Sequence, residues 1–193
     1  EPAIFVHMSS ILIEEGETDK ALEYLALGRE SFEEDQGLIN TEINLYIQLG
    51  RTSELIGKLG EAIALDEENE LLYFNRGTIY DQEGDIDNAE KDYLTALILN
   101  PSAFGANYNL GALYFNQGVE TKNKANATSN NSLYEKLNNE ADAVFAKALP
   151  FLETAHNLNA DDKNTLLSLK QLYYLKSDYA KSEKMKKLIT ELK

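Results

Sequence analysis

The densest group of side chains that could do chemistry is the decapeptide 81–90, which reads Asp-Gln-Glu-Gly-Asp-Ile-Asp-Asn-Ala-Glu. Carboxylates at alternate positions around a glycine are typical of an EF-hand calcium loop. That loop needs its glycine at position 6, but counted from Asp81 this position holds Ile86, and Gly84 stands at position 4. The spacing therefore argues against a metal site and favours a turn between two helices.

Catalysis has little support in the sequence. The chain has two histidines, no cysteine and no glycine-rich loop that would hold a phosphate. Its paired carboxylates lie in segments with the composition of solvated turns and helix faces, where no apolar surroundings would raise a carboxyl pKa. We predict a protein that is not an enzyme, has no catalytic residues and takes no cofactor. A hydrolase that uses scattered carboxylates is the alternative.

The overall composition is that of an ordinary globular protein. Of the 193 residues, 43% are hydrophobic and 26% are charged, which argues against a disordered chain. No apolar run approaches the roughly 20 residues that a membrane-spanning helix needs. We therefore predict no transmembrane segment.

Charge is distributed unevenly along the chain, whose net charge is −15. Residues 1–103 carry 23 acidic and 6 basic side chains, whereas residues 163–193 carry 8 lysines and 3 acids. Nucleic-acid binding depends on clustered Lys and Arg that neutralise phosphates. Most of this surface would repel a nucleic acid, so we predict that the partner is a protein or peptide.

The elements that position these side chains follow a repeat of 34 residues. In the third copy, residues 70–103, large, small, aromatic and turn residues alternate at fixed places: Tyr73, Gly77, Tyr80, Gly84, Ala89, Tyr93, Ala96 and Pro101. Looser copies precede and follow this one in register. A period of this length is typical of a solenoid built from helix-turn-helix repeats.

This pattern resembles the tetratricopeptide repeat family, and the resemblance covers almost the whole chain. It implies an all-α, right-handed superhelical solenoid of about five helix-turn-helix repeats that form a single domain. The repeats are expected at residues 2–35, 36–69, 70–103, 104–162 and 163–193. Small residues at the eighth, twentieth and twenty-seventh places of a repeat would let its helices approach closely.

Two local features refine this expectation. Gly16, Gly50, Gly84 and Gly118 recur just past the expected first helices, where a positive φ is common and glycine adopts it cheaply. In the fourth repeat an insertion at about 119–143 contains no proline and no glycine. Ser132 and Glu135 there form a capping-box pattern, so we expect two elongated helices that form a protruding hairpin arm.

In the family that the sequence resembles, the first helices of successive repeats line a concave groove that holds a partner segment. Carried over place by place, the groove residues are His7, Asn40, Asn44, Phe74, Asn75, Thr78, Tyr108, Asn109, Phe115, Asn116, Gln171 and Tyr174. Amides can hold a peptide backbone through paired donor and acceptor bonds, and aromatic rings can cover apolar side chains. Packing against neighbouring helices is an equally good explanation for Phe74 and Phe115.

Together these patterns predict a non-catalytic protein-interaction module that binds a protein segment in its concave groove. The alternative is a structural subunit of a larger envelope complex, which would contact its partners through the helical arm or the outer face. The resemblance is to tetratricopeptide proteins of the bacterial cell envelope, and it implies a periplasmic or envelope location, with the cytoplasm as the other possibility. The sequence leaves the oligomeric state open.

Overall fold

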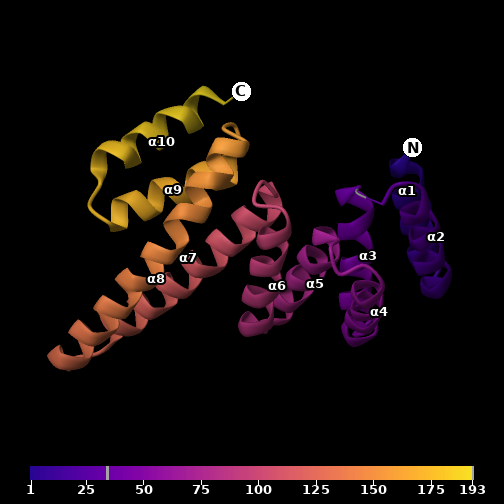
Figure 1. The fold of residues 1–193 in the computed structure, drawn as a ribbon, viewed down its shortest axis with the longest axis horizontal. Helices are drawn as coiled ribbons and strands as arrows, with labels where there is room; N and C mark the ends of the chain where they lie inside the picture. Colours follow the sequence, from indigo (N-terminus) through magenta and orange to yellow (C-terminus); the bar gives the residue numbers. More distant parts are fainter. Residues whose placement is uncertain (34, 193) are drawn as a thin grey trace. The chain divides into compact units, whose positions relative to one another are not determined.

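The computed structural model describes residues 1–33 and 35–192. Within these ranges the chain forms α-helices joined by short turns, and no strand (Figure 1). None of the helices described is both long and apolar enough to cross a membrane. The helices are α1 (Pro2–Glu14), α2 (Thr18–Ser31), α3 (Gln36–Gln48), α4 (Thr52–Leu65), α5 (Glu70–Glu83), α6 (Ile86–Leu99), α7 (Phe104–Ala127), α8 (Asn131–Leu158), α9 (Lys163–Leu175) and α10 (Tyr179–Glu191).

The helices group into two compact units. The N-terminal unit is Glu1–Ile79 and the C-terminal unit is Tyr80–Lys193, with the boundary inside α5. Along the described chain successive helices are joined by short turns into helix-turn-helix pairs, which confirms the predicted all-α repeat architecture. A single domain that runs through both units remains a prediction.

The core of the N-terminal unit lies between α1, α2, α3 and α4. It is built from aliphatic side chains and one tyrosine that are almost completely buried, including Leu25, Leu38, Ile39 and Tyr46. Gly28 allows α2 to approach α1 closely, because a Cβ at this position would lie 2.7 Å from the Cγ atom of Phe5. Gly28 thus takes the role that the repeat pattern gives to a small residue.

The C-terminal unit contains the elongated helix pair predicted for the fourth repeat. Helix α7 has 24 residues and α8 has 28, and the two run side by side (Figure 1). An added Cβ at Gly111 would lie 2.7 Å from the Cγ of Leu152. Leu152 and the neighbouring Phe145 are both buried in this pair. The long helices are therefore held together by close packing along their shared face.

The predicted glycine turns are present at three of the four positions. Gly16, Gly50 and Gly84 have φ values of 78°, 65° and 77°. Gly118 was expected to behave in the same way, and this expectation is wrong, because α7 continues through it. A Cβ at Gly118 would lie 2.5 Å from the Cε1 atom of Phe145, so this glycine serves close packing and not a turn.

The acidic decapeptide 81–90 joins the end of α5 to the start of α6. Gly84 takes the left-handed conformation, and Asp85 is the N-cap of α6. One carboxylate oxygen of Asp85 accepts a hydrogen bond from the backbone N–H of Asn88 at 3.3 Å, and the other accepts from the Asn88 side chain at 2.7 Å. The carboxylate that resembled a calcium ligand thus caps a helix.

The predicted capping box at the start of α8 is wrong. The N-cap is Asn130, whose side-chain oxygen accepts a hydrogen bond from the backbone N–H of Leu133 at 3.0 Å. Asparagine caps a helix about as well as serine, so the helix begins at Asn131 and includes Ser132 in its first turn. Helix α8 then continues without interruption through Pro150.

Candidate functional site

The groove residues predicted on α1, α3 and α5 lie in the N-terminal unit. His7 on α1, and Asn40 and Asn44 on α3, have exposed side chains. Phe74 and Thr78 on α5 are half-buried, and the Thr78 hydroxyl donates a hydrogen bond to the carbonyl oxygen of Phe74 at 3.0 Å. That bond lies within one turn of helix and does not prepare either side chain for a partner.

Asn75 is a buried amide on α5. Its residue is 2% exposed, and neither the nitrogen nor the oxygen of its side chain has a hydrogen-bond partner among the residues described. An unsatisfied buried polar group costs about 1–3 kcal/mol. A bound segment could reach this amide only if neighbouring side chains moved. Its assignment to the groove therefore remains a prediction.

The next predicted groove residues lie on α7 in the C-terminal unit, and one of them, Asn109, belongs to a chain of hydrogen bonds. The side-chain nitrogen of Asn109 donates to the hydroxyl of Tyr93 at 3.2 Å, and that hydroxyl donates to the carboxylate of Asp81 at 3.4 Å. Burial raises the pKa of Asp81, and the bond from Tyr93 partly opposes this shift. Asn109 therefore has a fixed orientation before any partner arrives.

Tyr108 precedes Asn109 and stacks on its own helix. Its ring lies nearly parallel to that of Phe104, with 6.3 Å between the ring centroids and 12° between the planes. Burial, followed by the negative charge of Asp162, raises the pKa of the Tyr108 phenol. Both effects favour the neutral phenol, which can donate a hydrogen bond. Asn116, two turns further along α7, is exposed.

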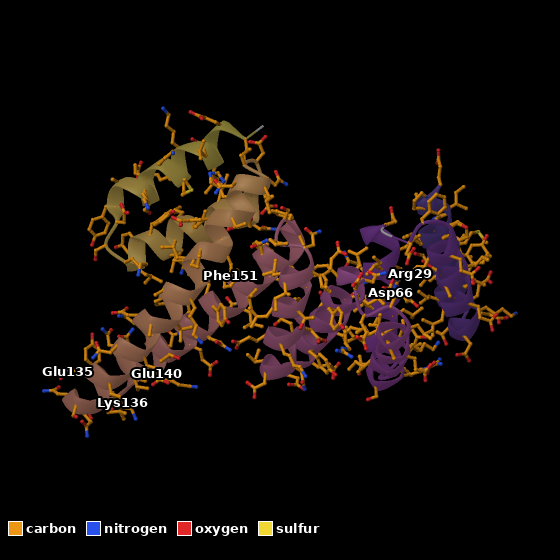
Figure 2. The ribbon with its side chains drawn as sticks, viewed as in Figure 1. Arg29, Asp66, Glu135, Lys136, Glu140 and Phe151 are labelled. Carbon is orange, nitrogen blue, oxygen red and sulfur yellow. The ribbon has the colours of Figure 1, made fainter. Side chains whose placement is uncertain are left out.

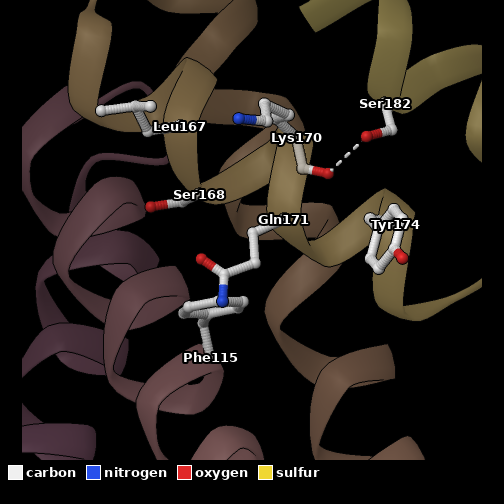
Figure 3. Close-up of a pocket in the computed structure, with 7 residues that line it drawn as sticks. All are labelled: Phe115, Leu167, Ser168, Lys170, Gln171, Tyr174 and Ser182. Atoms are coloured by element: carbon white, nitrogen blue, oxygen red, sulfur yellow. Dashed lines mark hydrogen bonds between the residues drawn. The ribbon is translucent and has the colours of Figure 1, made fainter. Parts of the chain in front are cut away.

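A pocket in the C-terminal unit brings three of the predicted groove residues together. We call it the α9 pocket; it has a volume of about 430 Å³, within the usual range for binding pockets. Its lining consists of one residue of α7, five of α9 and one of α10: Phe115, Leu167, Ser168, Lys170, Gln171, Tyr174 and Ser182 (Figure 3). Phe115, Gln171 and Tyr174 were all predicted from the sequence.

The walls of the α9 pocket combine rigid and exposed apolar surface. Phe115 is only 9% exposed, and its ring packs against Phe145 with 6.0 Å between centroids. Tyr174 is 62% exposed and makes an edge contact with Tyr179. The Gln171 side chain extends from α9 toward the Phe115 ring (Figure 3). The pocket therefore offers a fixed aromatic base, an accessible aromatic wall and one amide with both a donor and an acceptor.

Hydrogen bonds to the neighbouring helices fix the position of α9. The Ser182 hydroxyl on α10 donates to the carbonyl oxygen of Lys170 at 2.9 Å (Figure 3). On the other side, the hydroxyl of Tyr173 donates to the Glu153 carboxylate on α8 at 2.6 Å. Burial and then this carboxylate raise the pKa of the Tyr173 phenol. The pocket wall is thus anchored at both sides.

Ser168 also stands at a groove place of the fifth repeat, whereas sequence reasoning missed the other three residues of the α9 pocket, which are Leu167, Lys170 and Ser182. A signal for Lys170 was present, since it occupies the eighth place of its repeat. Gly77 and Gly111 hold that place in the two preceding repeats. A lysine where a small residue is expected must turn its long side chain aside, and here it does so at the pocket.

A second pocket, in the N-terminal unit, has a comparable volume but a different character. Its cations are already paired, because Arg51 contacts Asp19 at 2.6 Å and Glu54 at 2.7 Å. The Lys58 ammonium donates to the hydroxyl of Tyr46 at 3.0 Å. Both cations of this pocket thus already have partners and are not free for a ligand, so the α9 pocket is the better candidate.

Metal-dependent chemistry finds no support in the side-chain arrangement. In the part of the chain that the structure describes, no group of three or more His, Asp and Glu side chains is placed to hold a metal ion. Among the described residues that line the α9 pocket there is neither a histidine nor a carboxylate. What the pocket can do chemically is hold an apolar side chain and hydrogen-bond a backbone.

Comparisons with known proteins agree with this architecture. Residues 77–118 match the sequence pattern of the TPR repeat family. No curated protein matches the chain. A crystal structure of the protein MamA is 16% identical, covers 98% of this chain and 90% of MamA, and has a TM-score of 0.60.

Two further solved structures share the fold. PilF of Pseudomonas aeruginosa is 15% identical with a TM-score of 0.64, over 100% of this chain and 76% of PilF. A monomeric mutant of IFIT1 with Gppp-AAAA is 18% identical with a TM-score of 0.67, over 90% of this chain and 37% of IFIT1. At these identities the likeness concerns the fold alone.

The match over residues 77–118 shows tetratricopeptide repeat sequence in this segment, and the helix pairs before and after it have the same architecture. Solenoids of this kind present extended concave surfaces on which other proteins bind. A fold of this kind implies a scaffold for protein–protein interaction.

Proposed function

We propose that this protein is a non-catalytic adaptor that binds a segment of another protein on the concave face of its C-terminal unit. The face consists of α7 and α9, the first helices of two successive repeats. The α9 pocket is its centre. The partner segment would place an apolar side chain in this pocket and align its backbone with the amide of Gln171.

The observation that carries this proposal is the convergence of three predicted residues in one pocket. Phe115 on α7 lies more than fifty positions before Gln171 and Tyr174 on α9, yet all three line the same cavity. An exposed aromatic side chain beside an ordered one is a common feature of binding hot spots. Tyr174 is among the most exposed of the large apolar side chains in the chain.

Hydrogen bonds that already orient the polar groups of this face also support binding here. Asn109 is held by Tyr93, and α9 is anchored to α8 and α10. A surface whose polar groups are already oriented loses less conformational entropy when a partner binds. The same contacts explain how the site keeps its shape in the absence of a partner.

A peptide-display library, screened against the full chain, tests the proposal and does not require the natural partner. Selected peptides are measured against the wild type, Tyr174→Ala and Gln171→Ala. We expect each truncation to weaken binding about tenfold, which corresponds to about 1.4 kcal/mol. Both side chains are exposed, so neither variant should lose more than about 0.5 kcal/mol of stability.

Tyr134→Ala provides the matched control, since Tyr134 is an exposed tyrosine on the arm, outside the α9 pocket. Its affinity for the selected peptides should equal that of the wild type. Peptides that bind Tyr174→Ala and Gln171→Ala as tightly as the wild type would contradict the assignment of the site to the α9 pocket.

One observation favours a second candidate, in which the arm makes the contact. Leu133 and Tyr134 are exposed in the first turn of α8, where the arm ends. Glu135, Lys136 and Glu140 lie at the same end (Figure 2). If the arm is the docking element, the selected peptides should bind Tyr134→Ala more weakly than the wild type and should bind Tyr174→Ala with unchanged affinity. One set of variants therefore decides between the two candidates.

A further inference from the structure

The cation of the α9 pocket is the ammonium group of Lys170. It forms no ion pair with any residue that the structure describes, although lysines of the adjacent α10 do. Lys181 pairs with Glu153 at 3.6 Å, and Lys186 pairs with Glu183 at 3.0 Å. A ligand of this pocket should therefore bring a negative charge as well as an apolar side chain.

The N-terminal unit presents a segment with this chemistry. Leu65, the last residue of α4, is 91% exposed. The leucines that end α6 and α8 at the same place of the repeat, Leu99 and Leu158, are 36% and 42% exposed. Leu65 is thus far more exposed than its counterparts, and a large apolar side chain in this state is a candidate anchor for an interface.

Three carboxylates follow this leucine directly. Asp66, Glu67 and Glu68 are exposed, and none of them forms an ion pair with a described residue. Asp66 lies at the end of α4 (Figure 2). We call residues 65–68 the acidic turn. An apolar anchor joined to accessible acids is the chemical complement of an apolar pocket that holds an accessible lysine.

We propose that the α9 pocket of one copy of this chain binds the acidic turn of a second copy. Leu65 of one copy enters between Leu167 and Tyr174 of the other, over the ring of Phe115. A carboxylate of the acidic turn then pairs with Lys170. The inference rests on the proposed function, because it assigns an occupant to the same pocket.

The uneven distribution of charge along the chain supports the acidic turn as the occupant of the pocket. Residues 1–79 carry 17 acidic and 5 basic side chains, whereas residues 163–193 carry 8 lysines and 3 acids. Opposite charges on the two surfaces accelerate encounter and penalise the wrong orientation. The two contact surfaces differ, so the contact is heterologous and joins copies head to tail, as rings or as open chains.

Sedimentation velocity on the full chain over a range of concentrations tests the inference. The weight-average mass of the wild type should rise with concentration and fall when salt screens the charges. Leu65→Asp damages the acidic turn, and Lys170→Glu damages the pocket. Each variant alone should remain monomeric over the same range. Leu27→Asp is the matched control, because Leu27 is another exposed leucine of the N-terminal unit; it should associate as the wild type does.

A mixture of the two damaged variants gives the sharpest test. The Leu65→Asp copy keeps an intact pocket, and the Lys170→Glu copy keeps an intact acidic turn. An equimolar mixture should therefore form dimers with one copy of each and nothing larger. If circular dichroism shows that Lys170→Glu is unfolded, Tyr174→Ala takes its place, because that side chain is exposed.

Three results would overturn the inference: a wild type that is monomeric at every concentration, a Leu65→Asp or Lys170→Glu variant that associates as the wild type does, or a mixture of these two variants that stays monomeric. These failures are distinct from failure of the proposed function. If the chain is monomeric while display-selected peptides still lose affinity for Tyr174→Ala, only self-association is wrong. If those peptides are unaffected as well, the pocket is not the binding site.

Discussion

At the scale of single residues, the turn after a first helix imposes one backbone conformation on different residue types. Gly16, Gly50 and Gly84 adopt a positive φ, and Ser177 adopts a φ of 61° at the corresponding turn before α10. A side chain other than glycine pays about 1 kcal/mol or more in this region. The last turn is therefore a strained copy of the others.

This difference predicts opposite effects of two substitutions. Ser177→Gly should raise the free energy of unfolding by about 0.5–1 kcal/mol, because it removes the strain. Gly84→Ala should lower it by about 1 kcal/mol for the converse reason, since an added Cβ at Gly84 meets nothing within 4 Å. Urea unfolding measures both. Gly57→Ala, inside α4 and also without a clash, should be stabilising; if Gly84→Ala behaves in the same way, backbone conformation is not the cause.

Close packing predicts a larger loss at Gly118. An alanine there would place its Cβ 2.5 Å from the Phe145 ring, inside the core of the long helix pair. Overpacking of this kind costs about 1–3 kcal/mol. Thermal and urea unfolding of Gly118→Ala should show that loss. Stability equal to the wild type would show that Phe145 can move aside.

Buried phenols predict a loss of stability at alkaline pH. Tyr114 donates to Glu90 at 2.7 Å, and burial followed by this carboxylate raises the pKa of the phenol above its ordinary value. The folded chain thus favours the neutral phenol. This contribution is complete below the unfolded pKa of about 10 and is lost as the pH rises through the raised value.

Tyr114→Phe should therefore lower the free energy of unfolding at pH 7 by about 1–2 kcal/mol and reduce its further fall above pH 10. Urea unfolding at a series of pH values measures both effects. Tyr134→Phe, which alters an exposed tyrosine of the arm, is the control and should leave the curve unchanged. An unaltered alkaline fall in Tyr114→Phe would assign the titration to another group.

At the scale of elements, the sequence predicted local structure correctly at those repeat positions that have a single physical role. The turns at Gly16, Gly50 and Gly84 were predicted because a helix end that needs a positive φ favours glycine. Gly118 matched the same place by period, but the insertion extends α7 through it. Spacing alone could not show that its role had changed from turn to close contact.

The site was predictable in part for similar reasons. Gln171 and Tyr174 could be assigned because groove places follow from the helix period. Lys170 was missed because its place belongs to the packed face in other repeats, and the path of a long side chain depends on tertiary neighbours. Asn75 fits a groove place by spacing, yet it is buried, since burial depends on packing that one sequence does not specify.

The arm predicts a local effect of deletion. Replacing residues 121–143 by a short Gly/Asn turn removes the outer part of α7 and α8 but leaves the contact of Gly118 with Phe145 in place. Because solenoid repeats contact only their neighbours, the remaining helices should stay folded. The helical circular dichroism signal at 222 nm should fall only in proportion to the number of helical residues deleted. A cooperative loss of helicity in the remaining chain would show that the arm is part of the core.

At the scale of the whole molecule, the structure describes a helical scaffold with an ordered pocket at α9 and an acidic N-terminal unit. The chemistry of the pocket suits a segment with an apolar side chain and a negative charge, whether that segment comes from another protein or from a second copy. Both proposals depend on one claim, which is that the face of α7 and α9 is where the chain binds.

Amide hydrogen exchange, measured on the full chain with and without a display-selected peptide, tests that claim most directly. Peptide binding should slow exchange in residues 163–175 and in residues 104–118, which form α9 and the pocket side of α7. Exchange in α1 and in the outer part of the arm should not change. Protection confined to the arm or to the N-terminal unit, with none in α9, would contradict the account.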